Sequence, residues 1–296
     1  MTKSGLDCVN LLILGAPKCG TTTLYDAFST HPEIYMSPRK EPHYLSYVAD
    51  NWPDWACRGE EEYRGLFANA EGKRRRGEGS TWYLYSPNAA KHIKEHLPAD
   101  TKMIAMIRHP VDRAYSNFNF RIQLGAEKTL DFREALAMEP ERRAKGADWD
   151  YHYMNAGMYG EQIERYLEHF SREQLMIGLF EDLVKKPDLF YKEALSFLEV
   201  DDSLPLPKMD MASNITHRPA RPGLNNFMTS IKGLRKHARK IMPPSIKNKV
   251  HAFIQGEKAK PPKLDPDLRA ELTKTFHADI LKLEGLIDRD LSHWHS

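Results

Sequence analysis

Apolar runs of strand length alternate along the chain with stretches in which apolar residues recur at helical spacing. Residues 9–16, 101–107 and 174–180 are apolar runs without polar alternation, which is typical of strands covered on both faces. In 159–170, apolar side chains recur three and four positions apart, which predicts a helix with one buried face. The alternation predicts an α/β fold in which helices flank a central parallel β-sheet.

Further helices are expected from periodicity and from proline positions. Pro110 stands where a helix can start. The other predicted helices cover 21–30 (with threonines available as caps), 60–70, 88–97, 111–123, 131–138, 187–198 and 266–291. The stretch 200–223 is rich in Pro, Asp and Ser and predicts a long loop, of a kind that is usually functional or disordered. We expect one domain over residues 1–296, with 225–296 as its helical carboxy-terminal part.

The loop after the first predicted strand has the build of a phosphate-binding loop. Gly15 and Gly20 have the spacing of the two glycines in G-x-x-x-x-G-K-[ST], but Thr21 stands where that pattern has lysine. Lys18 lies inside the loop instead, so its charge meets a different point of the ligand. Backbone N–H groups and a helix start can still hold a phosphate. The pattern predicts a P-loop-like three-layer fold whose phosphate-containing ligand differs from a nucleoside triphosphate. A plain strand-to-helix turn is the alternative.

A second polar group follows the strand at 101–107. Arg108 stands at its carboxyl end, at the sheet edge where the first loop also lies, and a guanidinium there can bind a phosphate through two hydrogen bonds. Ser116 follows in the next helix, so the two side chains are expected to converge on one anionic group. The alternative is that Arg108 pairs with a nearby carboxylate such as Asp112.

Composition narrows the class of protein. The 296 residues are 41% hydrophobic and 28% charged, with a formal net charge of +2, as in soluble globular proteins. No apolar run approaches the ~18–20 residues of a membrane span, and the polar amino terminus lacks the apolar region of a signal peptide. Three cysteines and 13 histidines show no ligand spacing, so we expect no metal site and no disulfide framework. A cytoplasmic location is expected.

The motifs together resemble the sulfotransferases that use 3′-phosphoadenosine 5′-phosphosulfate (PAPS), in the branch with the heparan-sulfate sulfotransferases and many bacterial relatives. The segment 18–24 is similar to the family's 5′-phosphosulfate loop, 107–116 to its 3′-phosphate motif, and 40–45 to the acidic motif with its catalytic base. The resemblance implies metal-independent, in-line transfer of a sulfuryl group from PAPS to a hydroxyl of a carbohydrate or natural product. The product would be 3′,5′-adenosine bisphosphate (PAP).

The resemblance also implies residue roles. Lys18 is expected to stabilise charge on the leaving group, and Glu41 to take the acceptor's proton, with His43 as the alternative base. Arg108 and Ser116 are expected to bind the 3′-phosphate and so to select PAPS over ATP. The residues expected to contact the donor are Pro17, Lys18, Cys19, Gly20, Thr21, Thr22, Thr23, Arg108, Ser116, Tyr159, Arg221 and Gly223.

Some assignments have a purely structural alternative. Glu41 can instead form a surface salt bridge with Arg39 or Lys40, His43 can serve packing or acceptor positioning, and Tyr159 can be a core residue.

One position departs from the family pattern. Gly79 stands where related enzymes often have lysine, so a basic contact near the sulfuryl group or the acceptor is missing or supplied elsewhere, and the acceptor specificity of the heparan-sulfate enzymes is not assumed for this chain. Glu78 beside it can assist the acceptor or pair with the arginines at 74–76.

The segment 225–263 carries ten Lys or Arg and one acidic residue, Glu257, with interleaved apolar residues. It can face an acidic acceptor, an anionic membrane or a nucleic acid, or form a solvated helical cap. No nucleic-acid-binding fold is matched, and no nucleic-acid partner is expected. Two other functions stay open: a P-loop kinase or NTPase, against which Thr21 speaks, and a non-catalytic polyanion-binding protein.

Overall fold

The computed structural model describes residues 6–46, 56–207, 217–218 and 260–295. The chain forms two compact units, each built from segments that are distant in sequence. The first comprises Met1–His109, Met158–Asn214 and Phe276–Ser296, and the second Pro110–Gly157 and Ile215–Thr275. The single domain expected over 1–296 stays a prediction. Most of the long loop and of the basic segment expected from the sequence lies outside the described residues.

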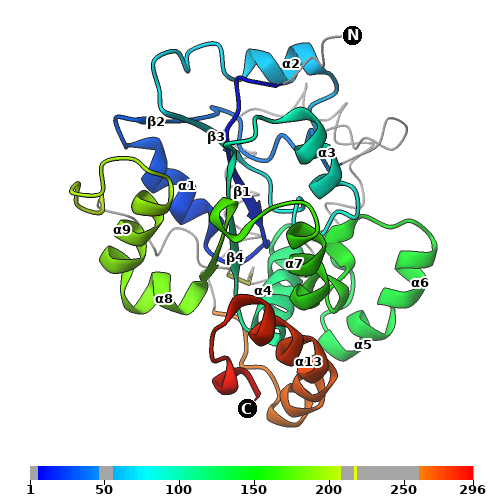
Figure 1. Cartoon of the computed structure of the whole chain (residues 1–296). Coiled ribbons are helices and arrows are strands. Elements are labelled where there is room, and N and C mark those ends of the chain that lie inside the picture. Colours follow the sequence, from blue (N-terminus) through cyan, green and yellow to red (C-terminus); the bar gives the residue numbers. More distant parts are fainter. Residues whose placement is uncertain (1–5, 47–55, 208–216, 219–259, 296) are drawn as a thin grey trace, which may run out of the picture. The chain divides into compact units, whose positions relative to one another are not determined.

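A parallel sheet of five strands forms the centre of the first unit (Figure 1). Its order is β2-β3-β1-β4-β5, and its strands are β1 (Leu11–Gly15), β2 (Ile34–Met36), β3 (Arg75–Gly79), β4 (Lys102–Ile107) and β5 (Leu175–Leu179). The predicted α/β class with a central parallel sheet is confirmed. The sequence indicated β1, β4 and β5 because they are apolar. Neither β2 nor β3 was found, since β2 is very short and β3 is polar.

Helices cover both faces of this sheet. In Figure 1, α1, α8 and α9 lie on one side of the strands, and α3 and α7 on the other. The helices assigned wholly to this unit are α1 (Thr21–Ser29), α2 (Glu60–Gly65), α3 (Ala89–His96), α7 (Tyr159–Leu167), α8 (Phe180–Lys185) and α9 (Pro187–Phe197). All but α8 were predicted, and the five predicted helices end one to five residues earlier than expected. The α8 helix follows β5 directly, so its sequence merges with the apolar run of that strand.

The second unit is helical in its described part. It contains α4 (Pro110–Gln123), α5 (Phe132–Ala137), α6 (Glu139–Ala144) and the first part of α13 (Pro266–Ile287). The ring of Phe118 packs against those of Phe132 and Tyr153, with centroids 5.0 and 5.9 Å apart. Glu127, fully buried, accepts hydrogen bonds from Arg142 at 2.7 Å and from the hydroxyl of Tyr153 at 2.7 Å. An ion pair and an aromatic cluster therefore stabilise this unit.

The topology of the first unit determines where a ligand can bind. All strands are parallel, so their carboxyl ends meet at one edge of the sheet. The central strand β1 has β3 on one side and β4 on the other. Ligands of open α/β sheets bind at such a point, where the strand order reverses. The loops that follow β1, β2, β3 and β4 therefore frame the candidate site.

Candidate active site

The loop after β1 has a backbone path that depends on glycine. Gly15 has φ 129°, and a Cβ there would lie 2.2 Å from the carbonyl oxygen of Thr81. Gly20 has φ 84° and stands at the N-cap of α1. No side chain caps α1 and no acidic residue lies in its first turn; the expected threonine caps are therefore wrong. The first N–H groups of a helix lack intrahelical partners. In α1 these groups lie next to the loop that carries Lys18, so they are positioned to bind an anion there.

Three cations gather beside this loop. Burial, together with the positive charges of Arg108 and Lys40, lowers the pKa of Lys18 to about 8. Repulsion of this kind is relieved when an anion binds among the cations. The site is therefore poised to take an anionic ligand.

Arg108 directly follows β4, and its guanidinium lies 4.9 Å from the ring centre of Phe180. In the part of the chain that the structure describes, no carboxylate forms a salt bridge with Arg108. Asp112, the alternative partner, binds Arg269 at 2.5 Å within the second unit. Ser116 lies in α4, also in the second unit, so its convergence with Arg108 stays a prediction.

The loop after β2 brings a carboxylate to the same edge. Oε2 of Glu41 accepts hydrogen bonds from the backbone N–H of Thr81 at 2.7 Å and from its hydroxyl at 3.0 Å. The same oxygen lies 2.9 Å from Nε2 of His43, and Oε1 lies 2.9 Å from Nζ of Lys40. The alternative pair with Lys40 is thus present, but as one contact among four. Arg39, the other alternative partner, binds Glu62 at 2.6 Å.

These contacts determine the charge of Glu41. Burial alone would raise its pKa, but the hydrogen bond from His43 and the charge of Lys40 outweigh burial and lower the pKa to about 2. The carboxylate is therefore ionised at any physiological pH. The Glu41 side chain is 28% exposed and that of His43 only 3%, so Glu41 is the member of the pair that a ligand can reach.

A second carboxylate, Glu78, lies behind this loop and is fully buried. It accepts hydrogen bonds from the hydroxyls of Ser80 at 2.8 Å and Tyr63 at 3.1 Å. Ser80 Oγ in turn accepts from the backbone N–H of His43 at 2.9 Å. The alternative pairing with the arginines at 74–76 is wrong, because Arg75 binds Glu199 at 3.0 Å instead. Glu78 thus supports the main chain that carries Glu41 and His43.

The burial of Glu78 predicts a pH dependence of stability. Burial raises its pKa from 4.5 to about 7 despite the hydroxyl donors. Between these values the folded chain holds a proton that the unfolded chain has lost, so stability falls as pH rises, by roughly 3 kcal/mol in all. We expect Glu78→Gln to flatten this fall between pH 4.5 and 7 in urea unfolding curves, and Glu95→Gln, on the surface, to keep it. Parallel curves for wild type and Glu78→Gln would contradict this.

Other predicted donor contacts lie deeper than expected. Cys19 is fully buried, Thr21 and Thr23 are 5% exposed, and Tyr159 is 1% exposed. The Tyr159 hydroxyl lies 3.8 Å from Sγ of Cys19, so the tyrosine packs beneath the loop, and its expected contact with adenine stays a prediction. Pro17 is also buried, whereas Lys18, Gly20 and Thr22 are half-buried. Arg221 and Gly223 lie outside the described residues.

Two contributors to this edge were not predicted from the sequence. Thr81 binds Glu41 through both its backbone N–H and its hydroxyl, and Ser80 links Glu78 to His43. Both follow β3, a polar strand that lacks the hydrophobic signal. The sequence signal available was the Ser-Thr pair beside the glycines of 77–79, but nothing in it pointed to Glu41.

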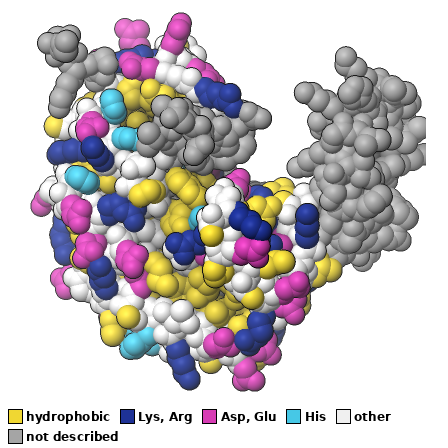
Figure 2. Space-filling model, turned by 90° about the vertical axis from the view of Figure 1, so that its right-hand side faces the viewer, with side chains coloured by type: hydrophobic (Ala, Val, Ile, Leu, Met, Phe, Trp, Pro, Cys, Tyr) yellow, Lys and Arg dark blue, Asp and Glu magenta, His cyan; other side chains and the backbone are white. Residues whose placement is uncertain are grey.

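The described residues contain no cluster of His, Cys, Asp or Glu suited to a metal ion, and none of their helices could span a membrane. On the face in Figure 2, basic and acidic side chains are interspersed.

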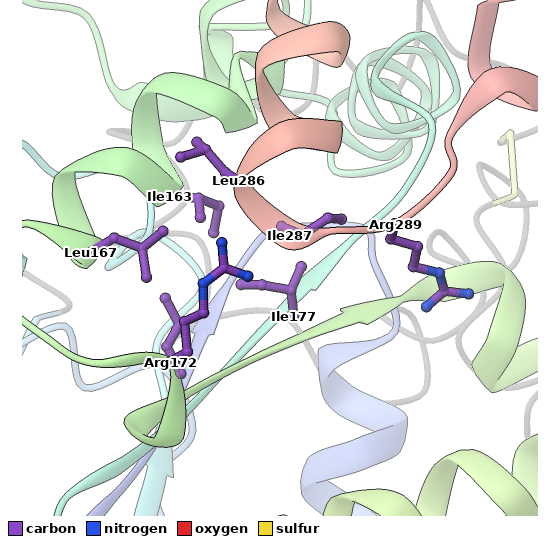
Figure 3. A pocket seen from close by; sticks show the side chains of 8 residues that line it. Ile163, Leu167, Arg172, Ile177, Leu286, Ile287 and Arg289 are labelled. Atoms are coloured by element: carbon purple, nitrogen blue, oxygen red, sulfur yellow. The ribbon is translucent and has the colours of Figure 1, made fainter.

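A cavity of about 130 Å³ lies between α7, β5 and the end of α13 (Figure 3). The residues that line it include Ile163, Ile177 and Leu286, and none belongs to the candidate site.

Comparison with known proteins identifies a family. A family model described as "Sulfotransferase domain" matches residues 9–260. The chain is 26% identical over 180 residues to heparan sulfate glucosamine 3-O-sulfotransferase 6 of Mus musculus, and 32% identical over 114 residues to the membrane-associated sulfotransferase kil1 of Dictyostelium discoideum. These alignments cover 60% and 38% of this chain, and 48% and 23% of those proteins. The chain thus spans half or less of these relatives' length.

A solved structure matches nearly the whole chain. It is a sulfotransferase from Alicyclobacillus acidocaldarius, with 31% sequence identity and a TM-score of 0.76. The match covers 97% of this chain and 99% of that one. The resemblance inferred from the phosphate and acidic motifs is confirmed. Since the family model covers most of the chain and the relative shares its fold over nearly its full length, this chain belongs to the sulfotransferase family.

Proposed function

We propose that this protein transfers a sulfuryl group from PAPS to a hydroxyl of a carbohydrate or natural-product acceptor. One observation carries the proposal. An ionised, partly exposed carboxylate, Glu41, lies at the same sheet edge as the glycine-bounded loop with Lys18, and Lys40 connects the two electrostatically. Sulfuryl transfer to a hydroxyl requires a base for the acceptor's proton and a cation for the leaving group.

The residues of the first unit fit the donor. The uncapped start of α1 and the backbone at Gly20 suit the 5′-phosphosulfate. Arg108, without a carboxylate partner in the described chain, suits the 3′-phosphate through a bidentate contact. Lys18 lies inside the loop, where we expect its charge to meet the bond to be broken rather than a terminal phosphate. The site thus favours PAPS over a nucleoside triphosphate.

The proposed chemistry balances without a further reactant. Glu41 takes the proton of the acceptor hydroxyl as that oxygen bonds to sulfur. The bond between sulfur and the 5′-phosphate oxygen breaks, and Lys18 stabilises the charge that stays on PAP. His43, buried behind Glu41 and donating to it at 2.9 Å, orients the carboxylate. We therefore assign catalysis to Glu41 and Lys18, and positioning to His43.

The acceptor class rests on the relatives and on position 79. Several relatives are named as carbohydrate or heparan sulfate sulfotransferases. In this chain the ring of Tyr25 covers Gly79, where a Cβ would lie 3.3 Å from Tyr25 Cδ2. A lysine at this position would need Tyr25 to move. We propose a hydroxyl acceptor of carbohydrate or natural-product type, bound without a lysine at 79, in a cytoplasmic protein.

Calorimetric titration with PAP tests the donor. We expect tight binding of PAP that EDTA does not change, and weak binding of ATP–Mg²⁺. A preference for ATP–Mg²⁺ would favour a P-loop kinase or NTPase. Salt-dependent binding of heparin without any binding of PAP would favour a polyanion-binding protein. A panel of sugars and natural products incubated with labelled PAPS then identifies the acceptor.

Arg108→Ala is expected to weaken PAP binding by about 10- to 100-fold, because a charge-assisted bidentate contact is lost. Adenosine 5′-phosphosulfate lacks the 3′-phosphate, so its affinity should change far less. Calorimetry with both ligands measures the difference. Arg172→Ala is the matched control, since Arg172 precedes β5 at the opposite edge of the sheet. Equal losses for both ligands would reject the assignment of Arg108 to the 3′-phosphate.

A further inference from the structure

The end of the chain places a tryptophan inside the first unit. The short turn η4 (Ser292–His295) carries Trp294, whose side chain is 1% exposed. Its indole N–H donates to Oε1 of Glu181 at 2.8 Å. Its carbonyl oxygen accepts a hydrogen bond from Nε2 of His109 at 3.0 Å. One residue thus binds the ends of two different strands, because His109 follows β4 and Glu181 follows β5.

Both partners of Trp294 are sequence neighbours of residues at the donor site. His109 is next to Arg108, and Glu181 is next to Phe180, whose ring supports the Arg108 guanidinium at 4.9 Å. Trp294 therefore holds both sides of the Arg108–Phe180 pair through their adjacent residues. An arginine side chain has many rotamers, so its affinity for an anion depends on how well its surroundings fix it beforehand.

Trp294 is also connected to the loop after β1 through Tyr159. Its ring centroid lies 5.9 Å from that of His109 and 6.4 Å from that of Tyr159. The hydroxyl of Tyr159 lies 3.8 Å from Sγ of Cys19, inside the loop. Phe180 packs against the same loop, because a Cβ at Gly20 would lie 3.0 Å from its ring. The contact of Trp294 with the loop after β1 is thus indirect, through Tyr159, whereas its contact with His109, the neighbour of Arg108, is direct.

We propose that Trp294 is a positioning residue of the donor site, which holds Arg108 in the orientation that binds the 3′-phosphate. The inference rests on the proposed function, in which Arg108 contacts that group. A tryptophan that served packing alone would affect stability and the binding of every nucleotide alike. A positioning residue affects the ligand with a 3′-phosphate selectively.

The test compares PAP with adenosine 5′-monophosphate, which shares the adenosine and the 5′-phosphate but lacks the 3′-phosphate. We expect Trp294→Ala to weaken PAP binding by about tenfold and adenosine 5′-monophosphate binding by less than about twofold. Trp294→Phe keeps the aromatic packing and the main-chain carbonyl but loses the indole N–H, so PAP should weaken by about threefold. Calorimetry at one pH and salt concentration gives the ratio of variant to wild-type Kd for each of the two variants with each of the two ligands.

Substitutions at Glu181 separate the hydrogen bond from packing. Glu181→Gln keeps an acceptor for the indole and should retain PAP affinity. Glu181→Ala removes the indole contact and also the contact of Oε1 with His293 Nε2 at 2.9 Å, so it should weaken PAP binding at least as much as Trp294→Phe. Trp149→Phe, in the second unit, is the control and should leave both affinities unchanged. Should Trp294→Ala fail to fold, Trp294→Phe and Glu181→Ala still carry the test.

The outcomes separate the two proposals. Wild-type protein that does not bind PAP overturns the proposed donor and this inference together. Wild-type protein that binds PAP, combined with variants whose PAP and adenosine 5′-monophosphate affinities fall equally or not at all, overturns the role of Trp294 alone.

Discussion

Lys18→Ala is expected to lower kcat by about 10²–10³-fold and to leave the fold intact, because a cation that meets charge developing on the leaving group acts mainly in the transition state. Transfer of label from PAPS to the best acceptor of the panel measures the effect. Lys91→Ala, on the exposed face of α3, is the control. Turnover close to that of the wild type would remove Lys18 from the mechanism.

The lowered pKa of Lys18 adds a second expected result. The pKa is about 8, so in the free enzyme Lys18 is charged below pH 8 and becomes neutral above it. We expect kcat/KM of the wild type to fall as pH rises past 8. In Lys18→Arg the guanidinium stays charged, so any residual activity should lack this alkaline fall. An identical fall in both proteins would assign it to another group.

Glu41→Gln is expected to preserve PAP binding and to lower kcat by about 10²–10⁴-fold, since an amide cannot take the acceptor's proton. The pKa of about 2 keeps Glu41 ionised in the wild type, so this group should cause no fall of activity between pH 5 and 8. Calorimetry with PAP and the same transfer assay separate binding from turnover.

The control for Glu41→Gln is Glu95→Gln, which changes an exposed carboxylate of α3. Activity of Glu41→Gln within about threefold of the wild type would give the base role to His43 or to water. Loss of PAP binding together with activity would show that Glu41 supports the donor loop instead.

Local sequence predicted the elements that are buried on both faces. The strands β1, β4 and β5 are apolar almost throughout, and burial on both faces requires such a run. β3 was not predicted because Arg75, Glu78 and its glycines carry no hydrophobic signal. Its two glycines and Glu78 are nevertheless buried. Glu78 can be buried there because hydroxyl groups of residues outside β3 donate hydrogen bonds to it. These partners cannot be identified from the five residues of the strand alone.

The sequence by itself determined the family, the α/β sheet, and the presence of Lys18 and Arg108 after two buried strands. It could do so because parallel strands place their carboxyl ends at one edge, so residues after different strands share a neighbourhood whatever the intervening loops do. Only the tertiary structure decided the surroundings of these groups. Thr81 meets Glu41 across 40 residues, and Trp294 meets His109 across 185. Charge state and orientation depend on such partners, which the folded paths of distant segments bring together.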